Sequence, residues 1–245
     1  MSTLCICSKN EVYKIFQRKK YWLILALTLW ITVCGALSRL LTNNFISFSS
    51  QNYPYAILSL CCYLFIPFTA LMLASDLISG EYERNELKLL LTRHISRTEL
   101  LLGKLAAVMI YEFFLTAVNV IAALIFSLIL SGFTSVNIFV VLMSVVITII
   151  PIAAFVSFAG IISVFCKSGI SAFGMGVAAY GGFTLLGLVF SRVSSSIFTS
   201  YLTLYKMIIG QNIPMFRLIL GIGVLLGFSL LFLSAASMKF EKREF

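Results

Sequence analysis

The chain has 245 residues, of which 60% are hydrophobic and only 11% are charged, and its formal net charge is +9. Soluble domains carry about 25% charged residues, so this composition indicates a protein of the lipid bilayer. It argues against nucleic acid as a partner, because a basic binding patch needs a polar scaffold; the positive charge is instead typical of residues that flank membrane spans.

Residues 1–20 are predicted to form an amphipathic helix that lies in the membrane interface. Its apolar face carries Leu4, Val12, Ile15 and Phe16, and its polar face carries Glu11, Lys14 and Arg18. A helix of this kind places basic side chains near anionic headgroups. The alternative is a solvated tail.

Residues 21–245 are predicted to form one transmembrane domain, which makes the whole chain an all-α polytopic membrane protein. Its six spans are expected at about 21–41, 54–75, 105–130, 137–165, 170–190 and 215–237. Each is long enough to cross about 30 Å of hydrocarbon. In the fourth span, Pro151 is expected to kink the helix, because proline removes one backbone hydrogen bond.

The distribution of basic residues predicts the orientation. If the N-terminus is cytoplasmic, only four of the 18 basic residues fall on the outer side. These four are Arg39, Arg192, Lys206 and Arg217. The remaining fourteen lie inside, so we expect a multi-pass protein of the cell (plasma) membrane with both termini in the cytoplasm.

Two apolar segments have unusual composition. Residues 191–214 are too polar to span the membrane and too apolar to float free, so they form either short helices in the outer interface or a loop packed on the bundle. In the fifth span, Gly174, Ala178 and Gly182 recur every four residues. Small residues at this spacing predict close helix packing, either within the chain or between two chains.

The sequence lacks the motifs that mark ATPases and metal-dependent or aspartyl proteases. It has no GxxxxGK[ST] phosphate loop, no HExxH, one histidine and one aspartate, Asp76. It therefore predicts no catalytic residues, no metal site and no ATPase activity in this chain. The six cysteines do not have zinc-ligand spacing and are interpreted as reduced packing thiols.

A charged stretch at residues 76–104 interrupts the apolar sequence and holds five of the nine acidic residues and the only histidine. Ser96-Arg97-Thr98-Glu99 fits a capping box that starts the third membrane helix. Gly80 is expected to break the end of the second span, and residues 81–91 are expected to form a short amphipathic helix between the two breaks. The alternative is a solvated charged loop.

Glu112 lies inside the third span, where a carboxylate is costly and usually faces a cavity or a partner. With Thr116, Asn119 and Ser127 it forms one polar stripe on the helix. The stripe is either a substrate path or switching contact, or a hydrogen-bonded seam between helices. A stand-alone transporter or channel driven by an ion gradient would use Glu112 as its proton site.

The charged stretch resembles the signature of the ABC-2 type permease family, the membrane subunits of ATP-binding-cassette transporters. The matching segments are Ser79-Gly80-Glu81, Glu86-Leu87-Lys88-Leu89-Leu90-Leu91, Ile95-Ser96-Arg97 and Gly103-Lys104. The chain departs from the family pattern at Asn85-Glu86, where the family has Gly-Thr, and at His94, where it has proline. Length, six spans and an interfacial N-terminal helix add to the resemblance.

The resemblance implies that the short helix between spans two and three is a cytoplasmic coupling helix seated in a separate ATPase subunit. Glu81, Glu83 and Glu86 would face the ATPase, Arg84 and Arg97 would support them, and His94 would lie at the hinge. The ATPase would bind ATP and Mg, and this chain would need no cofactor. Two permease chains, identical or not, would assemble with two ATPases in the bilayer.

The resemblance also implies transport of an amphipathic or hydrophobic substrate. We expect export, because no large external domain is present to receive cargo. In small members of this family such a substrate is often an antimicrobial peptide, exported or expelled for self-immunity.

Overall fold

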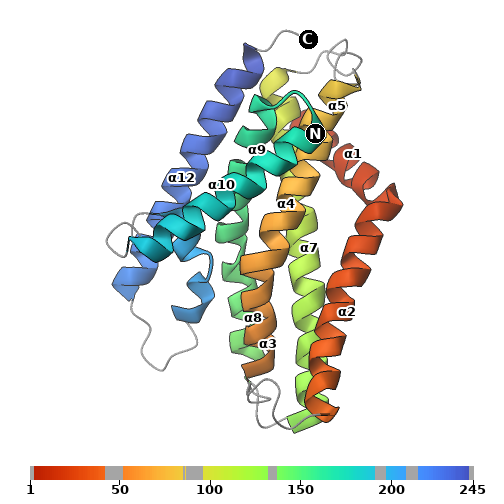
Figure 1. Ribbon diagram of the computed structural model, residues 1–245, viewed down its shortest axis with the longest axis vertical. Helices are drawn as coiled ribbons and strands as arrows, with labels where there is room; N and C mark the ends of the chain where they lie inside the picture. Colours follow the sequence, from red (N-terminus) through yellow and green to blue (C-terminus); the bar gives the residue numbers. More distant parts are fainter. Residues whose placement is uncertain are drawn as a thin grey trace.

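The computed structural model describes residues 3–41, 52–84, 86, 96–131, 137–190, 197–207 and 215–242. Those residues form helices and short turns without a β-strand. Six helices are long and apolar enough to cross a membrane. The predicted all-α membrane architecture is therefore confirmed, and the elongated bundle is shown in Figure 1.

Four of the six spans are single α-helices, and a further helix precedes them. The first helix is α1 (Thr3–Gln17), followed by the spans α2 (Lys19–Leu41), α7 (Arg97–Ser131), α10 (Gly169–Val189) and α12 (Met215–Glu241). The second span combines α3 (Tyr53–Leu60), η2 (Cys61–Phe65), α4 (Ile66–Ala74), η3 (Ser75–Ser79) and α5 (Gly80–Glu83). The fourth combines α8 (Ile138–Ile147) and α9 (Ile149–Phe165).

The second span runs without a break through Gly80, so the expected break there is wrong. Gly80 has ordinary right-handed helical geometry, with φ −68° and ψ −37°. A Cβ atom added at Gly169 would lie 3.6 Å from the Gly80 Cα. The start of α10 therefore lies in ordinary van der Waals contact with the backbone at Gly80.

The fourth span is interrupted at Thr148, between α8 and α9. Pro151 follows three residues later and has no N–H to donate to the carbonyl of Ile147. The interruption therefore lies where the proline removes a helical hydrogen bond, in agreement with the expected kink.

The core is built around α7 and α9. Helix α7 packs against α1, α2, α3 and α4, while α9 packs against α4, α10 and α12. Leu101, Leu115 and Phe155 are among the fully buried side chains at these contacts. In Figure 1, α1, α5 and the C-terminal end of α12 lie at the same end of the bundle.

The described part of the segment after α10 packs into the bundle as two short helices, η4 (Phe198–Tyr201) and η5 (Leu204–Met207). Phe198 is 1% exposed. Five phenylalanine rings lie around it at centroid distances of 5.3–6.2 Å: Phe155, Phe158, Phe183, Phe228 and Phe232. Residues 197–207 thus form short helices, as the first alternative expected, and these helices pack on the bundle, as the second expected.

The glycine-rich face of α10 is open in this single chain. A Cβ atom added at Gly174 or Gly182 would meet no other atom within 4 Å. The close contact on this helix is instead at Gly176, where an added Cβ would lie 2.3 Å from Leu71 Cδ2. Within the described residues, α10 therefore packs through Gly176 and not through the predicted stripe.

Candidate functional site

The start of α7 is held by a reciprocal cap. The Glu99 N–H donates to Ser96 Oγ at 3.2 Å, and the Ser96 N–H donates to Glu99 Oε2 at 3.3 Å. This is the capping box that the sequence predicts. It starts the helix at Arg97 and so places Lys104 two turns inside it.

Lys104 lies at the centre of a buried group of ionisable side chains, here called the charged cluster, which consists of Glu11, Lys14, Glu81 and Lys104. The Lys104 ammonium donates to Glu81 Oε2 at 2.5 Å and to Glu11 Oε1 at 3.1 Å. The side chains of Lys104 and Glu81 are 1% and 0% exposed. Three helices therefore meet at one lysine: α1 through Glu11, α5 through Glu81 and α7 through Lys104 itself.

Lys14 completes the charged cluster from its half-buried position on α1. It donates to the other oxygen of Glu81, and its ammonium lies 3.9 Å from Glu86 Oε2. The cluster contains two carboxylates and two ammonium groups, so its formal charge is zero. A buried charge is costly unless it is paired, and this balance is what allows Glu81 and Lys104 to lie inside the protein.

A second ion pair joins the beginning of α2 to the second span. Lys20 donates to Asp76 Oδ2, and the Tyr21 hydroxyl donates to the same oxygen at 3.1 Å. The Tyr111 hydroxyl on α7 donates to the Tyr21 carbonyl at 2.8 Å. The first, second and third spans are thus joined by polar contacts at one end of the bundle.

Two side chains of the charged cluster lie in places that differ from the sequence-based expectations. Glu81 was expected to face a partner, but its side chain is fully buried because Lys14 and Lys104 surround it. Glu11 was expected on the polar face of the first helix, but it is turned inward and is 6% exposed. The first helix also ends at Gln17 rather than at residue 20. Its buried face therefore carries a carboxylate as well as Ile15.

Other predicted coupling residues lie on the surface. Glu83 is exposed and accepts a hydrogen bond from the Gly169 N–H at 3.1 Å. Arg84 is exposed and donates from Nε to Glu86 Oε1 at 2.8 Å. Arg97 donates to the Glu241 carbonyl at 2.7 Å, which joins the start of α7 to the end of α12.

The predicted coupling helix falls largely outside the described residues. Helix α5 ends at Glu83 and Arg84 forms a turn, while residue 85 and residues 87–95 are not described. His94 is among these. Their arrangement stays a prediction.

Glu112 on α7 is fully buried in the middle of the bundle. Thr69 on α4 donates to Glu112 Oε2 at 2.8 Å, and Oε1 has no hydrogen-bond partner among the described residues. Thr116 donates to the backbone carbonyl of Glu112 at 2.8 Å rather than to its carboxylate. Glu112 therefore joins the polar stripe to the second span by a side-chain hydrogen bond.

The polar stripe contacts the first span at Asn119. Asn119 Nδ2 donates to Thr28 Oγ1 at 3.1 Å, and Asn119 Oδ1 accepts from Thr32 Oγ1 at 2.9 Å. The Tyr53 hydroxyl donates to the Thr32 carbonyl. At Asn119 the stripe is thus a hydrogen-bonded seam, the second of the two expectations; at Glu112 it leaves one acidic oxygen unpaired.

The sequence reasoning did not identify Glu11, Thr28 or Thr32 as site residues. Thr28 and Thr32 are four residues apart and share one face of α2, so a search for polar pairs at helical spacing would have found them. For Glu11 no comparable signal exists, because its partner Lys104 is 93 residues away. The residues that the structure describes include no group of three His, Cys, Asp or Glu side chains that could hold a metal.

The comparisons with known proteins give one family. The family model described as "ABC-2 family transporter protein" matches residues 5–212. The matched range includes the charged cluster, the polar stripe and five of the six spans. No curated protein matches the chain.

Proposed function

This chain belongs to the ABC-2 family of transporter membrane subunits, and from that membership we propose that it exports an amphipathic or hydrophobic substrate with ATP hydrolysed by a separate cytosolic ATPase. The end of the bundle that carries α1 and α5 is the cytoplasmic end in this proposal. The two termini are then cytoplasmic, and the membrane is the plasma membrane.

The observation that carries the proposal is the charged cluster. Two of its residues flank, in the chain, residues 84–96, the segment that connects spans two and three. Glu81 precedes this segment, Lys104 follows it, and the two side chains are joined by a buried ion pair. A force on the segment therefore reaches both spans together, and α1 moves with them through Glu11 and Lys14.

The charged residues at the two ends of this segment are the proposed contacts with the ATPase. Glu83, Arg84 and Glu86 carry the accessible charges, and Arg97 stands at the far end of the segment. Glu81 has a different role in this proposal: it transmits the movement inside the permease and does not touch the partner. His94 lies in the part of the segment that would enter the ATPase.

The proposed complex contains two permease chains and two ATPases, which bind ATP and Mg. The second permease chain is either identical to this one or a related chain. The substrate enters from the membrane or its inner leaflet, because the chain is built almost entirely of membrane helices. An antimicrobial peptide, secreted or expelled for self-immunity, fits this route.

The experiment is co-purification followed by transport. The tagged chain is expressed with a candidate ABC ATPase from the same source, and substrate uptake into inverted vesicles is measured with and without ATP. The double variant E83A/E86A should reduce recovery of the ATPase. As a control, Lys206→Ala changes an exposed charge in the segment between α10 and α12 and should leave recovery unchanged. If no ABC ATPase is recovered, or if transport is the same without ATP, the proposal is wrong.

A second candidate function is an ion-gradient-driven transporter or channel, and it rests on Glu112. A fully buried carboxyl group with one unpaired oxygen is a plausible proton carrier in a membrane helix. Glu112→Gln keeps the acceptor for Thr69 but cannot release a proton. Transport that is lost in E112Q, abolished by a protonophore and independent of ATP would favour this function over the ATPase-driven one.

A further inference from the structure

Lys206 lies at a depth in the bundle where membrane proteins seldom leave a charge without a partner. It belongs to η5, and the adjacent Tyr205 hydroxyl donates to the Tyr55 carbonyl of the second span at 3.1 Å. In Figure 1 the short helices η4 and η5 are the blue segment between α10 and α12, part of the way along the bundle. Tyr63, which Lys206 approaches, lies ten residues after the start of the second span, about 15 Å from its outer end in the proposed orientation.

The surroundings of Lys206 supply two hydroxyl groups but no negative charge. The Lys206 ammonium lies over the Tyr63 ring, 5.7 Å from its centroid. The Tyr63 hydroxyl lies 3.5 Å from Thr203 Oγ1, and the Tyr63 carbonyl accepts from the Tyr180 hydroxyl at 2.9 Å. Lys206 is exposed, and so is Tyr63, at 45%. An ammonium and two hydroxyls are thus accessible together; Lys206, Tyr63 and Thr203 are here called the Lys206 site.

The sequence holds no acidic residue that could neutralise Lys206 at this depth. None of the nine acidic residues lies at 21–75 or 113–240, the ranges that contain the outer half of every span. Glu112, the one acid in the middle of the bundle, is fully buried and accepts from Thr69. Lys206 accordingly forms no ion pair with any residue that the structure describes. A second copy of the chain would bring no acid to this depth either, so the anionic partner comes from another kind of molecule.

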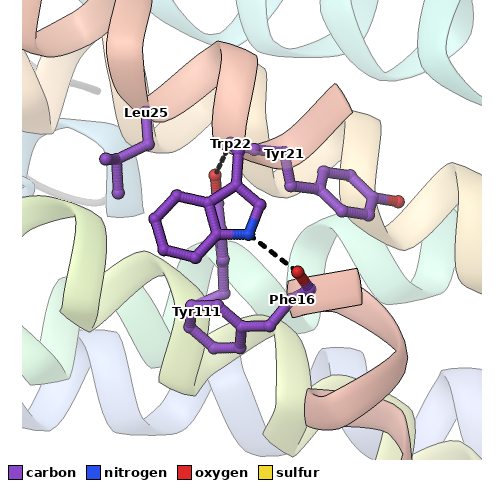
Figure 2. Close-up of a pocket in the computed structure, with 5 residues that line it drawn as sticks. All are labelled: Phe16, Tyr21, Trp22, Leu25 and Tyr111. Carbon is purple, nitrogen blue, oxygen red and sulfur yellow. Dashed lines mark hydrogen bonds between the residues drawn. The ribbon is translucent and has the colours of Figure 1, made fainter. Parts of the chain in front are cut away.

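The opposite end of the bundle treats its polar groups differently. Lys20, at the start of α2, is paired with Asp76. Figure 2 shows the neighbouring side chains, among which Trp22 Nε1 donates to the Phe16 carbonyl at 2.7 Å. Each of these groups finds its partner within the chain. Lys206 carries the same charge as Lys20 but lacks a carboxylate, and this difference marks it as a binding residue rather than a structural one.

We propose that the Lys206 site binds the acidic group of the transported molecule, so that the cargo is an anionic amphiphile. Its phosphate or carboxylate lies against the Lys206 ammonium and accepts hydrogen bonds from the Tyr63 and Thr203 hydroxyls. Its hydrocarbon part lies against Leu64 and Phe68 of the same span, which are exposed. Charge complementarity names this occupant, because a charge inside the membrane is costly unless it meets a partner. The inference rests on the proposed function in calling the ligand the cargo.

An anionic lipid is the other source of such a group, and the depth of the site argues against it. The hydrocarbon core of a bilayer is about 30 Å thick. A site about 15 Å from the outer end of the span therefore lies near the middle of the membrane, whereas lipid headgroups lie at its surface. A molecule that crosses the bilayer passes this depth with its acidic group, and a resident lipid does not.

The test is direct binding to the full-length protein in phosphatidylcholine nanodiscs. The probe is radiolabelled hexadecyl phosphate, and its control is hexadecylphosphocholine, which has the same hydrocarbon chain and no net charge. Binding is measured by scintillation proximity against empty nanodiscs of the same composition. K206Q should weaken hexadecyl phosphate at least about tenfold, because a charge-assisted hydrogen bond is lost, and should leave hexadecylphosphocholine unchanged.

Two variants separate the charge at Lys206 from general effects. K206R keeps the positive charge and should retain most of the affinity for hexadecyl phosphate. R217Q removes another exposed basic residue of the outer side and should bind as the unaltered chain does. Equal binding by K206Q and the unaltered chain, a K206R variant that binds no better than K206Q, or an equal loss in R217Q would overturn the proposal.

A second set of nanodiscs, which contain phosphatidylglycerol, distinguishes cargo from lipid. Hexadecyl phosphate should still bind to the protein above the level of empty nanodiscs of that composition. If phosphatidylglycerol displaces it, the occupant is a lipid and the assignment to cargo is wrong. The assay contains neither ATPase nor ATP. A negative result therefore refutes this substrate class and leaves the ATPase partnership standing, whereas failure to recover an ATPase would refute ATP-driven export and leave the binding site in place.

Discussion

Replacing Glu81 by alanine should destabilise the protein far more than replacing the neighbouring surface carboxylate Glu83. Glu81 is fully buried and bonds to Lys104, whose side chain is 1% exposed. Removing one partner of a buried ion pair costs about 3–5 kcal/mol, because the remaining charge has lost its compensation. Lys104 keeps Glu11 at 3.1 Å, so we expect a loss near the lower limit, about 3 kcal/mol.

For a chain of this length, about 3 kcal/mol corresponds to a fall in the thermal midpoint of roughly 6–12 °C. The measurement is thermal unfolding of the purified protein in detergent, followed by circular dichroism. Glu83→Ala is the matched control: it removes an exposed carboxylate that accepts one hydrogen bond, from the Gly169 N–H. Its cost should be about 1 kcal/mol or less.

The double variant E81A/K104M distinguishes pairing from simple loss of side-chain volume. Removing both members takes away the uncompensated charge, so the double variant should be more stable than the sum of the single effects predicts, by about 1–3 kcal/mol. If E81A and E83A shift the midpoint equally, or if E81A and K104M are additive, the charged cluster does not act as a unit and the reasoning fails.

Two further predictions concern packing and thiol chemistry. Gly176→Ala should lower the free energy of unfolding by about 1–3 kcal/mol, because its methyl group would meet the buried Leu71. Gly182→Ala, on the open face of α10, should leave the free energy of unfolding nearly unchanged. Equal thermal midpoints for the two variants would contradict this packing. In single-cysteine variants, Cys7 should react with a maleimide more slowly than the exposed Cys5 and should need a higher pH. The reason is that burial raises the pKa of the Cys7 thiol and the thiolate is the reactive form. Equal rates for the two cysteines at each pH would show that Cys7 is accessible.

The sequence predicted the parts of the fold that depend on local pattern. Each of the six expected spans overlaps a helix that is long and apolar enough to cross a membrane. The capping box at Ser96 and Glu99 was identified from residue types three positions apart, and both of its hydrogen bonds form. The family resemblance, drawn from short motifs around the charged stretch, is confirmed by a match over residues 5–212.

The charged cluster was not predictable in the same way. Its central lysine bonds to residues 23 and 93 positions earlier in the chain. No local pattern shows that Glu11 and Glu81 meet at Lys104. Glu11 was therefore assigned to the polar face of its helix, and the family resemblance assigned Glu81 to the surface that faces the ATPase. The break expected at Gly80 does not form, because glycine only weakens a helix locally and the second span continues through it to Glu83.

The two π-helical turns of the second span, η2 and η3, determine which side chains face α7. A π-helical turn accommodates one residue more than an α-helical turn, and one residue corresponds to about 100° of rotation. Thr69 follows η2 and reaches Glu112, while Glu81 follows η3 and reaches Lys104. If one of these π-helical turns were an ordinary α-helical turn, the residues that follow it would be rotated by about 100° about the helix axis. Thr69 and Glu81 would then be turned away from their partners on α7. The pairing of charges at the end of the bundle thus depends on backbone register as much as on the identity of the residues.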